Sequence, residues 1–285
     1  MSGFHKNLRW YGLGVLFIGV VFIWYVVLNE SFGGKLEVAV LDIGQGDAIF
    51  IESPGGQEVL VDGGPDRSVL SALAKIMPFY DRSIDLLVVT NPDKDHIAGF
   101  VDVIKKFKVG AMLIPGTFND TAVYKALLDT AEKSGLKIIL ARRGEKILIG
   151  GGAYIEVLFP DRDVSSLDTN TGSIIAKLIY GKTSMLLTGD APNGTEDYLA
   201  RIDGDKLKSD ILKVAHHGSK TSVSEFFYGV VSPQMAAISV GAGNSYGHPN
   251  KETLDMLDQF GIETLRTDQL GTIRFVSDGE KFVRE

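Results

Sequence analysis

The sequence T-N-P-D-K-D-H, from Thr90 to His96, follows an apolar run that ends at Val89. Such a run predicts a buried strand, then a polar loop, then the start of a helix. A loop can turn carboxylate, amide and imidazole groups onto one point, and these are donors that divalent metal ions accept. The alternative from these residues alone is a polar turn that caps a helix, with Asn91 or Asp95 as the N-cap.

Three further loops carry acids or histidines directly after predicted strands. L-L-T-G-D ends at Asp190, A-H-H-G-S contains His216 and His217, and S-Y-G-H-P contains His248. Each loop alone is a weak signal, because a strand-end aspartate often caps a helix and a loop histidine is often solvated. Together they place acids and imidazoles at four strand ends. We therefore expect a metal site at one edge of a sheet.

Seven motifs follow one another along residues 35–285 in a fixed order. They are L-D-I-G-Q-G-D-A-I (41–49), V-D-G-G (61–64), T-N-P-D-K-D-H-I-A-G (90–99), L-L-T-G-D (186–190), A-H-H-G-S-K-T-S (215–222), N-S-Y-G-H-P (244–249) and R-T-D-Q-L-G (266–271). In this order they resemble the metallo-β-lactamase fold, in the version found at the C-terminal end of ComEC-type DNA-internalisation competence proteins. The resemblance implies an α/β (α+β) protein, a four-layer αββα sandwich with a one- or two-metal site between the sheet edges.

The resemblance also implies a set of metal ligands. The superfamily motif reads H-x-H-x-D-H and the ComEC version H-x-D-x-D-H, whereas this chain has N-x-D-x-D-H, so Asn91 replaces the first histidine. By position, the first metal would take Asn91, Asp93 and Asp190. The second metal would share Asp190 as a bridge and would take these further residues: Asp95, His96 and His216.

Other residues have supporting or catalytic roles in this interpretation. Asp62 is expected to support the metal ligands, as is Asn170, which lies near the place of a second missing histidine. Asp47 and Asp42 are expected to tie loops at the edge of the site. The catalytic candidates are Asp95, His217 and His248; Ser219 and His248 are the candidates for binding a phosphate oxygen. An equal alternative for His217 and His248 is a structural, hydrogen-bonded role.

The side chains available as metal ligands predict the class of the cofactor, a divalent metal ion, rather than one particular ion. The chain has no cysteine, so thiolate ligands and disulfides are absent from the sequence. Oxygen-rich ligation suits Mn²⁺ or Mg²⁺, and imidazole suits Zn²⁺. We expect one or two divalent metal ions, with Mn²⁺ or Zn²⁺ ahead of Mg²⁺.

The N-terminal part differs in composition from the remainder. The run from Trp10 to Leu28 carries no charged residue and, at about 1.5 Å per residue, would reach roughly 28 Å as a helix. Lys6 and Arg9 precede this run, and Glu30 follows it. This pattern predicts a tail and a single transmembrane anchor in residues 1–34, with the N-terminus inside and the domain of residues 35–285 outside the cytoplasm. A cleaved signal peptide is the alternative.

Charge bears on the substrate. The chain has a formal net charge of −7, which does not favour nucleic acid by bulk charge. Four basic residues near the motif loops are expected to supply local positive charge: Lys213, Lys220, Lys251 and Arg266.

The sequence thus predicts a membrane-anchored, metal-dependent hydrolase, a phosphodiesterase or nuclease that acts on DNA in DNA uptake. The predicted partners are DNA or another phosphodiester, the membrane, and a separate channel protein. One alternative is a metal-poor pseudoenzyme that serves as a binding or scaffold subunit. Another is a hydrolase of a different ester or of a lactam.

Overall fold

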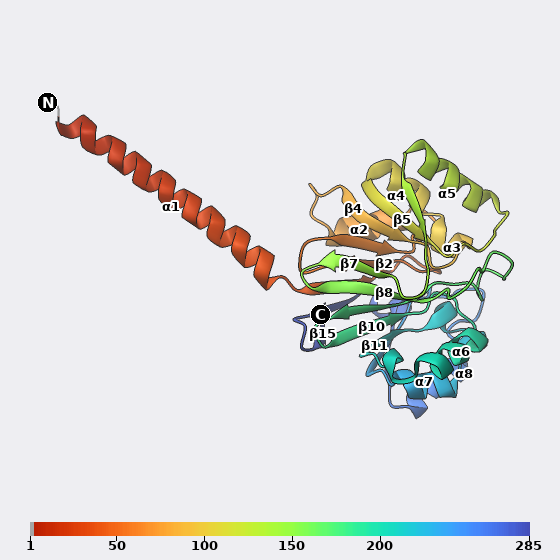
Figure 1. Cartoon of the computed structure of the whole chain (residues 1–285). Coiled ribbons are helices and arrows are strands. Elements are labelled where there is room, and N and C mark those ends of the chain that lie inside the picture. The colour runs from red at the N-terminus through yellow and green to blue at the C-terminus, as the bar shows by residue number, and fades with distance from the viewer. Residues whose placement is uncertain (1–2) are drawn as a thin grey trace.

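The computed structural model describes the backbone of residues 3–285 and the side chains of residues 10–25 and 34–285. Two β-sheets lie face to face, and helices cover their outer faces (Figure 1). The strand order is β15-β14-β1-β2-β3-β4-β5-β6 in the first sheet and β13-β12-β11-β10-β9-β8-β7 in the second. The predicted mixed α/β sandwich of two sheets and helices is confirmed.

The first sheet begins with antiparallel hairpins and continues with parallel strands. Strands β1, β2 and β3 pair antiparallel, whereas β3 to β6 pair parallel through helical crossovers. The bounds are β1 (Leu36–Val40), β2 (Ile49–Glu52), β3 (Glu58–Val61), β4 (Ser83–Val88), β5 (Lys108–Ile114), β6 (Lys137–Leu140), β14 (Ile273–Ser277) and β15 (Phe282–Arg284).

The second sheet has the same mixture. Strands β7 to β10 are antiparallel, and β10 to β13 are parallel. The bounds are β7 (Lys146–Gly150), β8 (Ala153–Phe159), β9 (Ile175–Tyr180), β10 (Thr183–Leu187), β11 (Ile211–Lys213), β12 (Met235–Ile238) and β13 (Glu263–Arg266).

Helices pack on both outer faces, so the sandwich has four layers. Apolar side chains fill the space between the sheets, the space between the first sheet and its helices, and the space between the second sheet and its helices. Removal of this apolar surface from water is the main force that holds the layers together. The helices on the first sheet are α2 (Ser68–Ile76), α3 (Lys94–Ile97), α4 (Phe100–Lys106) and α5 (Ala122–Lys133); those on the second are α6 (Asn193–Asp203), α7 (Glu225–Val231) and α8 (Lys251–Gln259). Short helices α9 (Thr267–Leu270), η1 (Gly204–Leu207), η2 (Ala215–Gly218) and η3 (Lys220–Ser222) lie in the connections.

The parallel strand pairs place the polar motifs at one edge of the sandwich. Val61 of β3 lies opposite Val88 of β4, and Leu187 of β10 lies opposite Lys213 of β11. The segments that follow these strands therefore leave the two sheets side by side. They carry the second, third, fourth and fifth motifs of the sequence.

Helix α1 (Gly3–Gly33) extends away from the sandwich (Figure 1). Its described apolar side chains, such as those of Trp10 and Phe17, are largely exposed. Among the residues that the structure describes, no helix is long and apolar enough to cross a membrane. The predicted transmembrane span is therefore not supported, and the side chains of its last residues, 26–28, lie outside the described part.

Helix α2 ends at Ile76, since Pro78 cannot continue it, and Phe79 and Tyr80 are exposed in the turn beyond. The terminal strand β15 is not predicted by the sequence. It is short and half exposed, so it lacks the apolar alternation on which strand prediction depends.

Candidate metal centre

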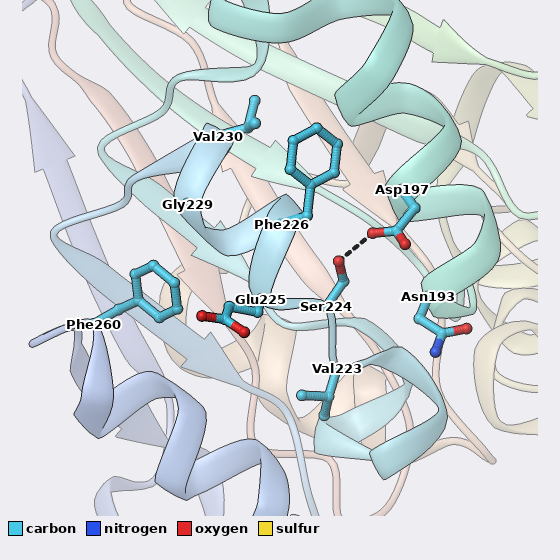
Figure 2. Close-up of a pocket in the computed structure, with 9 residues that line it drawn as sticks. All are labelled: Asn193, Asp197, Val223, Ser224, Glu225, Phe226, Gly229, Val230 and Phe260. Atoms are coloured by element: carbon cyan, nitrogen blue, oxygen red, sulfur yellow. Dashed lines mark hydrogen bonds between the residues drawn. The ribbon is translucent and has the colours of Figure 1, made fainter.

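Two hollows of the surface differ sharply in chemistry. One, of about 750 Å³, lies at α6 and α7 and is lined by both polar and apolar side chains, the latter including Phe226 and Phe260 (Figure 2). Its acids are Asp197, which accepts a hydrogen bond from Ser224, and Glu225. No histidine is among the described residues that line this hollow, so it lacks imidazole ligands for a metal ion.

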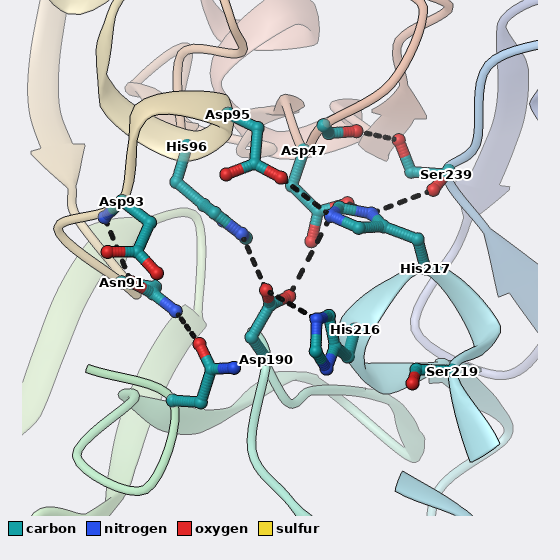
Figure 3. A network of polar contacts seen from close by, with 12 residues as sticks. Asp47, Asn91, Asp93, Asp95, His96, Asp190, His216, His217, Ser219 and Ser239 are labelled. Atoms are coloured by element: carbon teal, nitrogen blue, oxygen red, sulfur yellow. Dashed lines mark hydrogen bonds and ion pairs between the residues drawn. The ribbon is translucent and has the colours of Figure 1, made fainter. Parts of the chain in front are cut away.

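The second hollow, of about 180 Å³, lies at the edge where the polar motifs meet. Figure 3 shows side chains that converge here from both sheets, among them Asp95, Asp190 and His217. It is lined by Gln45, Asp93, Asp95, Asn170, Asp190, His216, His217, Tyr246 and His248. The structure therefore brings together residues from four of the predicted loops.

His96 lies at the buried base of this site. Its Nδ1 is 2.8 Å from Oδ2 of Asp62, which also accepts hydrogen bonds from the amide and hydroxyl of Thr90. Its Nε2 lies 3.1 Å from Oδ2 of Asp190, at ion-pair distance but without the alignment of a hydrogen bond. Asp62 thus fixes the ring from behind, in the way that a carboxylate orients a metal-binding histidine.

His217 approaches the same point from the second sheet. Its Nδ1 is 2.9 Å from the carbonyl oxygen of Ser239, while its Nε2 is 3.4 Å from Oδ2 of Asp95 and 3.9 Å from Oδ1 of Asp190. His216 lies further out, is partly exposed, and places its Nε2 3.8 Å from Oδ2 of Asp190.

The turn that presents these two histidines has an uncommon backbone. His216 and His217 have φ values of 50° and 54°, and Gly218 follows at 81°. Non-glycine residues rarely adopt this left-handed region, and such strain persists only where surrounding contacts impose it. The turn directs one imidazole inward and leaves the other at the rim.

A buried ion pair supports the His217 side of the site. Nζ of Lys213 is 2.7 Å from Oδ2 of Asp47, and both side chains are almost fully buried. Oδ1 of Asp47 lies 3.3 Å from Nδ1 of His217. Lys213 is therefore part of the interior. The sequence predicts that its charge is available to a substrate, but that charge compensates Asp47 behind the site.

The ionisable groups of the site depend on one another. Burial disfavours charge on His217, but the carboxylates of Asp47 and Asp190 outweigh burial and raise its pKa to about 10. For His96, too, Asp190 and Asp62 outweigh burial, and its pKa lies well above its usual range. Burial would raise the pKa of Asp190, but the two imidazoles hold it below its ordinary value. Without the protons on His96 and His217, the negative charge of the carboxylates would therefore exceed the positive charge of the site.

Overlapping groups of three side chains could each hold a divalent cation. The side-chain donors of Asp95, His96 and His217 lie within 4.8 Å of one another, as do those of Asp47, Asp190 and His217. Among the described residues, Nε2 of His96, Nε2 of His217 and Oδ1 of Asp190 are buried without a hydrogen-bond partner. Buried polar atoms are normally paired, so these orphaned donors indicate a group that completes them. We assign the candidate metal centre to Asp95, His96, Asp190 and His217.

The neighbouring side of the site is built differently. The carboxamide of Asn91, fully buried, accepts the amide N–H of Asp93 at 2.9 Å and donates to Asn170 at 2.6 Å. The carboxylate of Asp93 accepts hydrogen bonds from Asn119 at 3.0 Å and from Thr169 at 2.9 Å. Asn91 and Asp93, two of the three residues predicted for a first metal, are thus hydrogen-bonded to each other and to neighbouring side chains.

The remaining predicted residues lie at the rim or outside it. His248 is half-buried, and its ring packs against those of His216 and Tyr246. Ser219 is buried; its hydroxyl is 2.9 Å from that of Thr221 and accepts the amide N–H of that residue, so it holds the turn. Two of the predicted basic residues pair locally: Arg266 with Asp268 and Lys251 with Asp255. Lys220 is exposed beside the histidine turn.

Sequence reasoning missed several residues of the site. Asn119 and Thr169 lie outside the seven motifs, in loops without a signal of their own, and only the tertiary fold brings them to Asp93. Gln45 and Tyr246 lie within quoted motifs. Each of these motifs also contains an acid or a histidine, and this proximity is the sequence feature that could have identified Gln45 and Tyr246.

Comparison with known proteins identifies the class. Residues 41–227 match the model of the metallo-beta-lactamase superfamily. The chain therefore belongs to this superfamily, whose members are generally metal-dependent hydrolases.

Within the superfamily, the chain is similar to ComEC-type competence proteins, as its motifs predict. It is 33% identical to ComE operon protein 3 of Bacillus subtilis over 90% of this chain and 34% of that protein. It is 30% identical to competence protein ComA of Neisseria gonorrhoeae over 88% of this chain and 35% of that protein. The chain thus spans about a third of the length of these relatives.

Solved structures agree on the fold. The metallo-β-lactamase fold protein YhfI of Bacillus subtilis aligns with a TM-score of 0.53 and 14% identity over 85% of this chain and 100% of that one. Zn²⁺-bound PqqB of Methylobacterium extorquens aligns with a TM-score of 0.51 and 16% identity over 78% of this chain and 85% of that one. At such identities the likeness concerns the fold alone.

Proposed function

We propose that this protein is a metal-dependent phosphodiesterase that cleaves DNA. The observation that carries the proposal is the convergence of Asp95, His96, Asp190 and His217, with orphaned buried donors, at the base of an open polar hollow. The similarity to competence proteins favours DNA as the substrate. A bound divalent cation would lower the pKa of water and neutralise charge on the phosphoryl group.

The residues of the chain would then position the substrate. His216 and His248 line the hollow beyond the metal centre, where their ring nitrogens can donate to phosphate oxygens. Tyr246 stacks against His248 with ring centroids 5.9 Å apart and an interplanar angle of 25°, and its side chain is 68% exposed. An exposed aromatic ring beside the site offers a surface for an unpaired base.

The loop that carries Tyr246 is held in place. Asn244 accepts the amide N–H groups of Tyr246 and His248 and donates to the carbonyl oxygens of Gly241 and His248. A pre-formed loop loses little conformational freedom on binding. We therefore expect single-stranded DNA to be preferred, and Tyr246→Ala to weaken its binding by about 1–3 kcal/mol.

The test is cleavage by the purified full chain. Labelled single-stranded and double-stranded DNA would be incubated with Mn²⁺, Zn²⁺ or Mg²⁺, and the products separated by electrophoresis. We expect cleavage that requires the metal and disappears in Asp95→Ala. Glu225→Ala, which removes an exposed acid at the hollow of Figure 2, is the matched control and should cleave normally.

Two outcomes would redirect the proposal. Retention of metal without cleavage of DNA would favour hydrolysis of a different ester or of a lactam. Failure to retain any metal, together with absence of cleavage, would favour the binding or scaffold subunit.

The proposed location outside the cytoplasm rests on the sequence alone. Lys6 and Arg9 precede the apolar run and Glu30 follows it, as in a segment with its N-terminus inside. Protease treatment of intact cells would test this location, because an outward domain is degraded without lysis. Full protection until lysis would contradict it. A channel protein as partner would be sought by cross-linking in the same cells.

A further inference from the structure

We propose that the protein holds a single divalent cation, at Asp95, His96, Asp190 and His217, and that a hydrogen-bonded amide network occupies the place of a second. The network consists of Asn91, Asp93, Asn119, Thr169 and Asn170. The inference deepens the proposed function and rests on its metal dependence.

The orientation of the Asn91 carboxamide is fixed by its partners. The amide N–H of Asp93 can only donate, so the side-chain oxygen of Asn91 must face it. The amide nitrogen of Asn91 then faces Oδ1 of Asn170. An amide nitrogen carries hydrogens and offers no lone pair to a metal, so Asn91 presents a donor where the family pattern has an imidazole acceptor.

The Asp93 carboxylate is also committed. Asn119 donates from Nδ2 to the carbonyl oxygen of Pro92, a pure acceptor, which fixes the orientation of that amide as well. The same Nδ2 donates to one oxygen of Asp93, and the hydroxyl of Thr169 donates to the other. Both oxygens of Asp93 are thus already acceptors, and a cation would have to share them with these two donors.

The contrast with the four proposed ligands is direct. Nε2 of His96 and Nε2 of His217 are buried without a hydrogen-bond partner within the described chain, whereas the amide of Asn91 donates to Asn170 and accepts from Asp93. The His96 side of the site thus has buried nitrogens that a cation could complete, and on the other side Asn91 and Asp93 already have hydrogen-bond partners. With one cation, the oxygen that leaves phosphorus has no second metal beside it, so His216 and His248 are the groups placed to assist it.

Metal stoichiometry tests this inference independently of activity. The metal-free full chain would be titrated with Mn²⁺ by calorimetry, and bound metal counted after gel filtration. We expect one Mn²⁺ per chain, with the electron paramagnetic resonance spectrum of an isolated ion. His96→Ala should retain none, and Asn170→Ala, the matched control in the network, should still bind one.

A gain-of-site variant completes the test. Asn91→His combined with Asn170→His supplies two imidazoles and dissolves the amide pair, so we expect a second Mn²⁺ and a spin-coupled spectrum. A folded double variant that still binds one ion would overturn the role given to the amides. Two ions in the unmodified protein, one of them lost in Asp93→Asn, would overturn the inference outright, as would no bound ion at all.

The outcomes separate this inference from the proposed function. One bound Mn²⁺ without DNA cleavage would contradict the function and leave the single-cation centre standing. Two bound ions together with DNA cleavage would support the proposed function and contradict the single-cation centre.

Discussion

Glu58 and Asp62 lie at opposite ends of strand β3, and both carboxylates are buried. Burial raises the pKa of each. Asp62 faces the imidazole of His96, and nearby Asp47 faces the ammonium group of Lys213. The neighbours that act on Glu58 are acids: Asp81, Glu52 and Asp85.

This difference shows how the fold divides its charge. At the Asp62 end, imidazoles and an ammonium group allow several buried carboxylates to stay ionised around one point. At the Glu58 end, the carboxylate avoids the unfavourable free energy of a buried charge beside other acids by keeping its proton. Every group of three or more candidate metal ligands among the described residues lies at the Asp62 end. Ionised acids with imidazoles, rather than acids alone, mark the site.

The largest effect is expected from Asp190→Asn. Asp190 lies between His96 and His217, so the change removes the anion that both imidazoles approach. We expect Mn²⁺ affinity to fall by more than about 10²-fold, beyond the loss typical of a supporting residue, and DNA cleavage to disappear. Calorimetry and the cleavage assay measure both. Asp205→Asn, at an exposed acid, is the control; unchanged metal affinity in Asp190→Asn would contradict the assigned centre.

Next in size is Lys213→Met, which breaks the buried ion pair with Asp47. Removal of one partner leaves a buried charge uncompensated and typically costs about 3–5 kcal/mol. Urea denaturation measures the free energy of unfolding. Lys251→Met is the matched control, because its pair with Asp255 is exposed and is expected to contribute only about 0.3–0.5 kcal/mol. Equal losses in the two variants would show that Asp47 does not depend on Lys213.

Asp62→Asn should weaken metal binding without abolishing it. One of the two Asp62 oxygens that face His96 and Thr90 would become an amide nitrogen, which cannot accept a hydrogen bond. Loss of such a supporting carboxylate typically lowers metal affinity by about 10- to 100-fold. Calorimetry with Mn²⁺ gives the affinity, and Asp66→Asn, at an exposed acid four residues on, is the control. An affinity equal to that of the unmodified protein would remove Asp62 from the site.

Much of the Asp62 end was predictable from the sequence. The motifs at Thr90–His96, Asp190 and His216–His217 each follow an apolar strand, and parallel pairing brings such strand ends together. Local pattern and strand order therefore suffice to predict that these side chains converge. The sandwich itself follows from the same alternation of apolar strands and amphipathic helices.

Finer features depend on geometry that sequence does not encode locally. His216 and His217 are adjacent, and only their left-handed backbone determines which ring turns inward. The pair of Lys213 and Asp47 joins residues 166 positions apart. The amide nitrogen of Asn91 finds its acceptor in Asn170, in a distant loop. Because lysine is rarely buried unless it is paired, a lysine beside a motif is expected at the surface until its buried partner is known.

The smallest effect on metal binding is expected from Glu58→Gln, at the acidic end of β3. Burial, then Asp81, Glu52 and Asp85, raise the pKa of Glu58 from 4.5 to about 8. The folded chain then binds more protons than the unfolded chain between these values, so this group's contribution is fully present below pH 4.5 and is lost as the pH rises to about 8. Glutamine stays neutral and lacks this dependence.

We therefore expect Glu58→Gln to match the unmodified protein in stability near pH 4.5 and to exceed it at pH 8, while Mn²⁺ affinity stays the same at both. Urea denaturation across this range measures the difference, with Glu132→Gln, at an exposed acid, as the control. A pH profile of stability that is identical in Glu58→Gln and the unmodified protein would mean that Glu58 is ionised when folded. In that case a cation would have to lie beside it, and the two ends of β3 would not differ in the way their charges imply.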